Sequence, residues 1–408
     1  MNFFNIVSLK DAKALVMEDK YKLQTLPVKI HVTETLGRYT VHTVSSPIEL
    51  PQFDRSTVDG YAVRITDVSG ASESIPSMLS ICDEIKMGYE AKEVLSIGET
   101  SYIPTGGMLP QGAEGVVMIE HTEQLDAHTV LIQKPLSFGE NIIHRGDDLK
   151  FGDILIEKGQ RIRGLDMGLL AGAGISEVEI CVPFKVTILS TGDEIVDCDK
   201  EANLGEIFDI NGYALKGNVE EIGCEVVQKI IVKDNFEQLK SAIAYALNNS
   251  DLIIVSGGSS VGTRDFTQAV IESFEDGKLL FHGISIKPGK PTMVGAIGCK
   301  LIFCLPGHPT ASALVFHEIV KPYIYQGYHH KKEEVIINAL ITENLHASPG
   351  KDNFIPVTLI KEGEQNYAKP LLGKSGLFSI MAHASGYIHI SSEKEGVLKD
   401  TFVNVKLL

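Results

Sequence analysis

Carboxylates and lysines in this sequence gather where apolar runs give way to glycine or proline. Asp193 and Glu194 follow one such run, and Asp265 follows a stretch rich in glycine and serine. Lys287 and Lys290 flank a Pro-Gly pair after another run. Lysines beside exposed backbone N–H groups suit an anionic ligand, and carboxylates beside phosphates suit Mg²⁺, which commonly takes one or two carboxylates plus substrate oxygens. The pattern predicts a site for a phosphate-bearing ligand and a metal ion.

The stretch from Asp251 to Asp265 is the centre of this pattern. Residues 252–255 form an unbroken apolar run typical of a buried parallel strand. Residues 256–262 hold three glycines and three serines, which favours a loop whose N–H groups form an anion nest, although a tight turn has the same composition. A helix is expected from Phe266 onward. Asp265 therefore has two interpretations, a functional carboxylate or the start of a capping box with Gln268.

The elements that must position these residues alternate between strand and helix from Lys185 onward, as in a parallel α/β sheet. Helices are predicted near 210–222 and, from a capping box of Asp234 and Glu237, over the segment that follows. Ligands bind at the carboxyl ends of strands in such sheets, so the loops after four strands should share one pocket. These strands and their loops are 186–190 with 191–194, 252–255 with 256–262, 282–286 with 287–291, and 301–305 with 306–310.

The flanking regions have a different character. Residues 65–145 contain short β-like runs separated by glycine and proline, which predicts an all-β insert. Residues 327–408 predict a small β-barrel or sandwich. Just before the insert, Asp54, Arg55 and Asp59 lie in a turn-rich stretch that is either a loop network or part of a site.

Composition limits the function classes. The 408 residues carry a formal net charge of −16, which argues against nucleic-acid binding because phosphate backbones require a basic surface. The six cysteines form no Cys-x-x-Cys pair, so we expect buried reduced thiols rather than disulfides or metal ligands. Neither a signal peptide nor an apolar run long enough for a membrane span is evident, and we expect a cytoplasmic protein.

Five motifs in order resemble the molybdopterin molybdenumtransferase family, the MoeA-type enzymes related to the E domain of gephyrin. They are Phe53–Val63, Ser190–Glu194, Ser256–Asp265, Ile286–Pro291 and Leu305–Pro309. The resemblance covers essentially the whole chain and implies a multidomain α/β plus β fold. The implied parts are an N-terminal helix packed on the α/β domain (1–26), a linking domain (27–45 and 147–177), a β-rich inserted domain (46–146), a central parallel-sheet α/β domain that binds molybdopterin (178–326) and a C-terminal β-barrel domain (327–408).

The resemblance also implies a reaction. Adenylated molybdopterin and molybdate would give molybdenum cofactor and AMP, with Mg²⁺ as cofactor and molybdate as substrate. The implied assembly is a homodimer with its cleft between subunits, which makes transient contact with the molybdopterin adenylyltransferase that delivers the substrate.

Site residues carry over by position. The implied catalytic residues are Asp59, Glu194, Asp265 and Lys287, with Asp265 and Glu194 as metal ligands. Lys287 would offset developing negative charge. The implied substrate-binding residues are Thr105, Asp148, Thr191, Gly192, Ser256, Gly257, Gly258, Ser259, Gly262, Lys290, Pro306, Gly307 and Ser375.

Three departures from the family pattern bear on molybdate recognition. His308 stands where asparagine is common, Lys351 and Pro356 replace two arginines, and Ser385 replaces an asparagine. An arginine fork suits an oxyanion better than lysine does. Two alternatives therefore stay open, a non-catalytic pterin-binding or scaffold protein of the same architecture and a tungstate-preferring variant.

Overall fold

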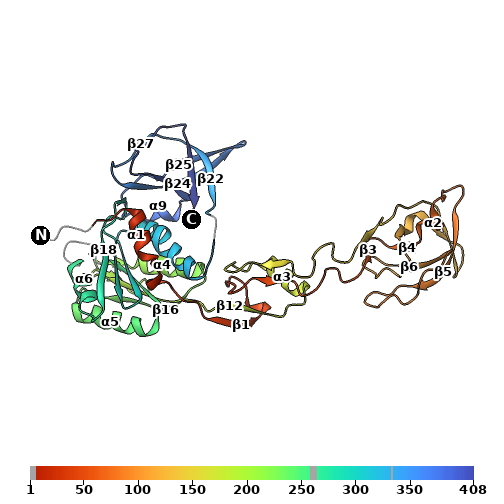
Figure 1. Ribbon diagram of the computed structural model, residues 1–408. Helices are drawn as coiled ribbons and strands as arrows, with labels where there is room; N and C mark the ends of the chain where they lie inside the picture. Colours follow the sequence, from red (N-terminus) through yellow and green to blue (C-terminus); the bar gives the residue numbers. More distant parts are fainter. Residues whose placement is uncertain (1–5, 258–263, 332–333) are drawn as a thin grey trace.

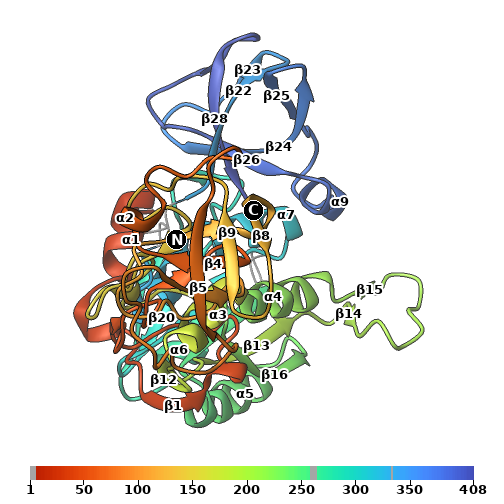
Figure 2. The same cartoon turned by 90° about the vertical axis from the view of Figure 1, so that its right-hand side faces the viewer.

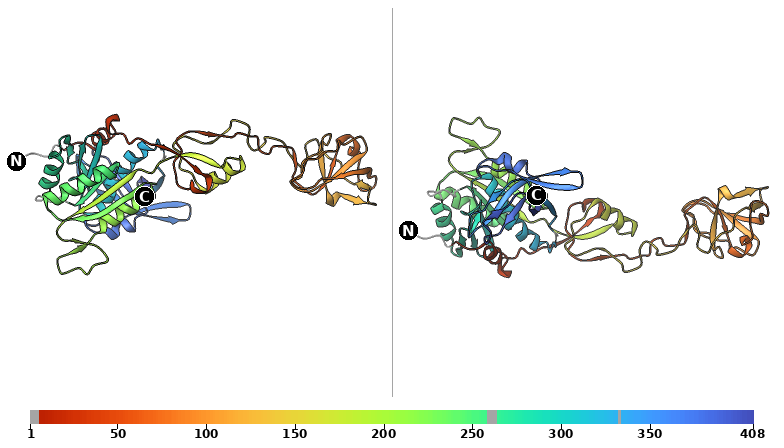
Figure 3. Two further views of the ribbon diagram at one scale, coloured as in Figure 1. Left: turned by 90° about the horizontal axis from the view of Figure 1, so that it is seen from below. Right: turned by 90° about the horizontal axis from the view of Figure 1, so that it is seen from above.

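The computed structural model describes residues 6–257, 264–331 and 334–408, with the backbone alone at Arg264 and Asp265. An α/β body carries a β-barrel on one side and a long arm on another (Figure 1). The arm consists of a small linking region and a distal β-rich region, and two further views show it extending away from the body (Figure 3). The α/β, inserted-β and C-terminal barrel classes expected from sequence are all present.

A six-stranded sheet organises the body, with strand order β16-β13-β17-β21-β20-β18. β20 is antiparallel to both neighbours, so the sheet is mixed rather than purely parallel. The strand expected at 282–286 ends at His282 instead, yet it runs in the same direction as β21. The strands are β13 (Lys185–Thr191), β16 (Glu225–Val232), β17 (Leu252–Gly257), β18 (Gly277–His282), β20 (Met293–Ile297) and β21 (Lys300–Leu305).

Helices cover both faces of this sheet. α5 and α6 pack on one face, where Ile253 and Val255 of β17 are buried. The other helices pack on the opposite face, against Leu252 and Ile254. This alternation explains why the strand reads as one continuous apolar run. The helices are α1 (Leu9–Val16), a 3₁₀ turn (Asp19–Tyr21), α4 (Ile210–Glu221), α5 (Phe236–Asn249), α6 (Arg264–Glu272), α7 (Pro309–Val315), a π turn (Phe316–Val320) and α8 (Lys321–Gly327).

Side-chain caps decide where several helices begin. Ser8 and Asp209 accept hydrogen bonds from backbone N–H groups at the starts of α1 and α4, as N-caps do. The cap of α5 is Asn235, whose side chain accepts from the N–H of Gln238. The predicted capping box beginning at Asp234 is therefore wrong by one residue, and this frees the Asp234 side chain for another role.

The C-terminal region is a closed barrel in which β24-β25-β22-β28-β26 returns to β24. β19, which follows the body strand β18, pairs with β24 and joins barrel to body. The buried side chains of Phe354, Met381 and Tyr387 belong to the same hydrophobic cluster as the body helices. The elements are β19 (Ile286–Lys287), β22 (Ile336–Ile341), β23 (Leu345–His346), β24 (Asp352–Glu362), β25 (Gln365–Pro370), α9 (Phe378–Ala382), β26 (Gly386–Ile390), β27 (Gly396–Val397) and β28 (Phe402–Leu407).

The arm is built from two small cores. Its linking part pairs β1 with β12 and β2 with β11 beneath α3. Its distal part is a six-stranded sheet of order β7-β4-β6-β5-β9-β8, flanked by the pair β3 and β10. The linking elements are β1 (Pro27–His31), a 3₁₀ turn (Val32–Glu34), β2 (Val44–Ser45), β11 (Ile154–Ile156), α3 (Gly164–Gly172) and β12 (Glu177–Cys181). The distal elements are β3 (Arg55–Ser56), β4 (Gly60–Val63), α2 (Ile65–Val68), β5 (Ser77–Glu84), β6 (Glu99–Ile103), β7 (Gly115–Met118), a 3₁₀ turn (Ile119–His121), β8 (Thr122–Gln124), β9 (Thr129–Ile132) and β10 (Ile142–Ile143).

All six cysteines are unpaired, but the expectation that they are buried is wrong for Cys82, Cys198 and Cys299, which are exposed. Within the described ranges, no helix combines the length and apolar character that a bilayer crossing needs.

Candidate functional site

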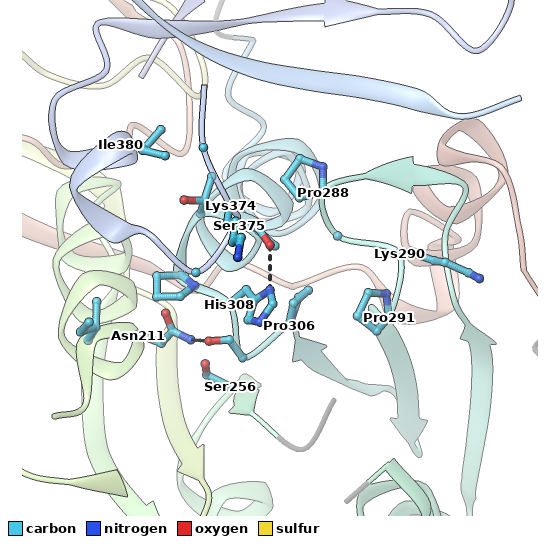
Figure 4. A pocket seen from close by; sticks show the side chains of 18 of the residues that line it. Asn211, Ser256, Pro288, Lys290, Pro291, Pro306, His308, Lys374, Ser375 and Ile380 are labelled. Carbon is cyan, nitrogen blue, oxygen red and sulfur yellow. Dashed lines mark hydrogen bonds between the residues drawn. The ribbon is translucent and has the colours of Figure 1, made fainter. Parts of the chain in front are cut away.

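A cavity of about 1250 Å³ lies between the carboxyl edge of the central sheet and the barrel. The loops after β13, β17, β18 and β21 line it from the body side, and residues of the segments 351–356 and 371–376 line it from the barrel side. Figure 4 shows Ser256, Pro288 and Pro306 from the body loops together with Lys374 and Ser375 from the barrel side. The parallel direction of these four body strands brings their ends to one edge. The predicted residues that line this cavity are Thr191, Gly192, Glu194, Ser256, Gly257, Lys287, Lys290, Pro306, Gly307 and Ser375.

Two glycines allow close backbone packing beside the cavity, Gly192 within its own loop and Gly257 against the end of β13. Gly192 has φ of +151°, and a Cβ there would lie 2.8 Å from a carboxylate oxygen of Glu194. Gly257 has φ of +103°, and its Cβ would lie 2.2 Å from the carbonyl oxygen of Thr191. The Thr191 hydroxyl is buried without a hydrogen-bond partner among the described residues. The unpaired Thr191 hydroxyl lies beside the backbone of two glycines, and an anionic group of a ligand can accept a hydrogen bond from this hydroxyl.

Carboxylates gather on one wall of the cavity. Glu194 and Asp234 both line it, and the Asp234 backbone N–H donates to Asp193 Oδ1 at 3.3 Å. Burial raises the pKa of Asp234, and the nearby carboxylates of Asp193 and Glu194 raise this pKa further. A bound cation would relieve this repulsion.

This donor set fits Mg²⁺ only together with substrate. Among the described residues, no three His, Cys, Asp or Glu side chains are arranged to hold a metal ion. Mg²⁺ usually takes one or two carboxylates and completes its shell with phosphate oxygens and water. Glu194 and Asp234 supply such a pair. Asp265 belongs to the first turn of α6, so its backbone lies inside the helix rather than before it, and its side chain is outside the described residues.

The segment of residues 192–209, which includes Glu194 of the acidic wall, projects from the body (Figure 2). It contains β14 (Ile195–Val196) paired with β15 (Ile207–Phe208). The Lys229 ammonium contacts it at two places, 3.0 Å from Asp197 and 3.2 Å from the buried Asp209. Hydrogen bonds from Tyr213 and Lys229 lower the pKa of Asp197 to about 2. This segment is therefore tied to β16.

Lysines from the loop after β18 and from the barrel form a second, basic wall of the cavity. Lys287, Lys290, Lys351 and Lys374 all line the cavity. The Lys287 ammonium donates to the hydroxyl oxygen of Ser348 on the barrel at 2.9 Å. In a chain with net charge −16, this concentration of cations is local. The cavity thus has one acidic wall and one basic wall, which suits an anionic ligand that also carries a metal ion.

A buried amide holds the barrel loop of this basic wall. Asn353 accepts from the Ser348 N–H at 3.0 Å and donates to the carbonyls of Ser348 and Lys351, at 3.2 and 2.7 Å. Both positions at which the sequence departs from the family arginines, Lys351 and Pro356, line the cavity. Ser385 does not line it, and its hydroxyl instead accepts from the N–H of Leu359 inside the barrel.

Three predicted residues lie elsewhere in this chain. Asp59 and Thr105 are in the distal part of the arm, in loops next to β4 and β6, which Figure 1 labels. Asp148 lies between β10 and β11, in the segment that joins the distal part to the linking part. Asp59 Oδ1 accepts from the Thr105 N–H at 2.7 Å, so these two form one exposed loop cluster. None of the three lines the cavity. Gly258, Ser259 and Gly262 lie outside the described residues.

Sequence reasoning missed several cavity residues. Asp234 was missed because its sequence context is that of a helix cap, and the available signal was an acidic residue in the loop that follows strand β16. Asn211 was read only as part of a helix, yet its amide donates to the Gly307 carbonyl at 2.9 Å in the cavity wall. Lys374 lies between β25 and α9 of the C-terminal region, far in sequence from the strands of the central sheet. No local sequence pattern indicates that it lines the cavity.

The fold and the site together define a class, a multidomain α/β protein whose ligand cavity lies between a doubly wound sheet and a closed β-barrel. Family models match nearly the whole chain. Residues 7–174 match the MoeA N-terminal region (domain I and II), residues 187–326 match a probable molybdopterin binding domain, and residues 338–408 match the MoeA C-terminal region (domain IV).

Individual relatives agree with these matches. A molybdopterin biosynthesis protein of Methanocaldococcus jannaschii is 33% identical, with 99% of this chain and 98% of the relative covered. A molybdopterin molybdenumtransferase of Haemophilus influenzae is 31% identical, with 98% of each covered. The crystal structure of a MoeA protein from Pyrococcus horikoshii superposes with a TM-score of 0.84 at 35% identity, over 99% of each chain. The chain belongs to the MoeA family, which confirms the resemblance inferred from its five motifs.

Proposed function

We propose that this chain is a molybdopterin molybdenumtransferase that takes adenylated molybdopterin and molybdate and releases AMP and molybdenum cofactor. The observation that carries the proposal is the cavity with an acidic wall at Glu194 and Asp234 and a basic wall at Lys287, Lys290 and Lys351. A substrate with a phosphoanhydride, accompanied by a metal ion and an oxyanion, has charges that match both walls.

In this proposal, some cavity residues bind the phosphate and others stabilise the charge that develops during the reaction. The backbone N–H of Gly257 and the Thr191 hydroxyl hold a phosphate oxygen at the sheet edge. Lys287 and Lys351 offset the negative charge that grows as the phosphoanhydride is cleaved. Mg²⁺, when bound by Glu194, Asp234 and Asp265, supplies Lewis-acid stabilisation of the phosphate oxygens. The molybdenum is received by the dithiolene sulfurs of the pterin, so the protein supplies no thiolate.

The active assembly in this proposal is a cytoplasmic homodimer. Asp59, Thr105 and Asp148 belong to the arm and not to the cavity wall of their own chain. An arm that reaches the cavity of a second copy would bring Asp59 and Thr105 to the ligand, with both subunits related by a two-fold axis. The molybdopterin adenylyltransferase is the proposed transient partner, because it would hand over the adenylated substrate.

The direct test is AMP release by the purified protein with adenylated molybdopterin, Mg²⁺ and molybdate. AMP release that requires both molybdate and Mg²⁺ supports the proposal. Tight binding of the adenylated pterin without AMP release would instead support a non-catalytic scaffold. Lys351 and Pro356, which replace two family arginines, both line the cavity. Replacement of molybdate by tungstate in the assay therefore tests whether the protein prefers tungstate.

A further inference from the structure

His308, one of the departures from the family pattern, contacts the barrel across the cavity. It lies on the loop between β21 and α7, and its Nδ1 is 2.7 Å from the hydroxyl oxygen of Ser375 on the barrel side (Figure 4). Both residues line the cavity. We propose that His308 is a positioning residue that donates from Nδ1 to Ser375 and so directs the Ser375 hydroxyl hydrogen toward the oxyanion substrate. This inference rests on the proposed transferase function.

The hydrogen-bonding capacity of the two groups gives the reason. A serine hydroxyl has one hydrogen and two acceptor lone pairs, and a neutral imidazole has one donor and one acceptor nitrogen. If Ser375 donated its hydrogen to Nδ1, its oxygen would present only lone pairs to the anion and would repel it. If Nδ1–H donates to Ser375, the hydroxyl hydrogen is free to donate to the anion. A bound oxyanion therefore selects the second arrangement, in which His308 acts through Ser375.

Separate contacts fix the backbone of the two loops, so His308 is left to orient the hydroxyl. The Thr310 N–H donates to the Ser375 carbonyl at 3.2 Å, and its hydroxyl donates to the Leu377 carbonyl at 3.2 Å. On the body side, Asn211 holds the carbonyl of Gly307, directly before His308. The position of the Ser375 backbone thus depends on Thr310, whereas the direction of its side chain depends on His308.

Amide variants separate this role from a general structural one. The side-chain nitrogen of an asparagine occupies a place similar to Nδ1 and can donate to Ser375, whereas a glutamine extends past it. We expect His308→Asn to keep the KM for molybdate within about threefold of the wild type. His308→Gln and His308→Ala should both raise it roughly tenfold, as for the loss of one hydrogen bond to a buried or charged group. The KM for adenylated molybdopterin and the melting temperature should stay unchanged in all three.

A double-mutant cycle completes the experiment. Ser375→Ala should raise the KM for molybdate by a similar factor, and adding His308→Ala to it should raise the KM no further. Independent, multiplicative effects would overturn the inference, and so would a His308→Ala enzyme with an unchanged KM for molybdate, or an equal rise in the KM for both substrates. Failure of the wild-type protein to release AMP would instead refute the proposed function, so the two failures are distinguishable.

Discussion

The Glu318 carboxylate lies 2.6 Å from the Lys13 ammonium, although 305 residues separate them in the chain. Glu318 is on the buried π turn after α7, and it also accepts from Tyr387 at 2.7 Å and from Lys406 at 3.2 Å. Lys13 belongs to the N-terminal helix, and the other two belong to barrel strands β26 and β28. One carboxylate therefore joins the N-terminal helix, the body and the barrel.

Removal of this carboxylate should loosen the barrel. Glu318→Leu removes the buried carboxylate that Lys13 and Lys406 share. Breaking a fully buried ion pair from one side costs about 3–5 kcal/mol, and the partial exposure of both lysines places the expected cost at or below the lower end of this range. We expect the calorimetric transition that includes the barrel to move to lower temperature. Glu334→Gln is the matched control, because Glu334 pairs with the same Lys406 from an exposed position and should cost less than about 1 kcal/mol. Equal effects of both variants would contradict a special role for Glu318.

The same carboxylate predicts a pH dependence. Burial alone would raise its pKa, but Lys13 and Lys406 together with Tyr387 lower the pKa of Glu318 to about 2. A depressed folded-state pKa gives stability that is present above the unfolded value, about 4.3, and is lost as pH falls toward 2. The stability difference between wild type and Glu318→Gln should therefore shrink as pH falls from about 4.5 to 2. A difference that stays constant across this window would show that Glu318 is protonated or unpaired in the folded protein.

Loss of the Lys287 charge should weaken anion binding. Its ammonium is held at the cavity by Ser348, so Lys287→Ala removes a positioned cation without opening the core. We expect the affinity for AMP, measured by calorimetry, to fall roughly tenfold or more, as for a hydrogen bond to a charged group. Lys369→Ala removes an exposed lysine of the barrel strand β25 and should leave the affinity unchanged. Unaltered AMP binding by Lys287→Ala would remove this lysine from the site.

Substitution of Asp265 tests whether its carboxylate binds the metal ion or only stabilises the start of α6. If it holds the metal ion, Asp265→Ala should abolish Mg²⁺-dependent AMP release while the melting temperature stays the same. If it only stabilises the first turn of α6 through the helix dipole, the melting temperature should fall by the equivalent of about 0.3–1 kcal/mol, with activity per folded molecule unchanged. Asp276→Ala, which removes an exposed carboxylate beyond the end of the same helix, is the control and should alter neither quantity.

The arm can be tested by complementation between subunits. Asp59→Ala alters the arm and Lys287→Ala alters the cavity, and each should be inactive as a homodimer. In a mixed dimer, one site carries both substitutions and the other carries neither, so purified mixed dimers should show about half of the wild-type activity. Mixed dimers that stay inactive would mean that Asp59 acts within its own chain or not at a subunit boundary. A monomeric wild-type protein in solution would refute the arrangement directly.

Much of the architecture followed from local patterns in the sequence. The apolar run at 252–255 predicted a strand buried on both faces, and the structure places Ile253 and Ile254 on opposite faces of the sheet. The sharing of one edge by four strand ends also followed, because strand direction and helical crossovers constrain it. The antiparallel strand β20 was missed, since an antiparallel strand inside such a sheet has no distinct local pattern.

The chemistry of individual side chains was decided by tertiary contacts. Asp234 has the sequence context of a cap, but Asn235 takes that role and Asp234 turns to the cavity. His308 meets Ser375 across 67 residues, and Glu318 meets residues from both ends of the chain. Such pairs depend on how the barrel packs against the body. Sequence periodicity reports which face of an element is buried, whereas the identity of the partner on the other side depends on the folded arrangement of distant segments.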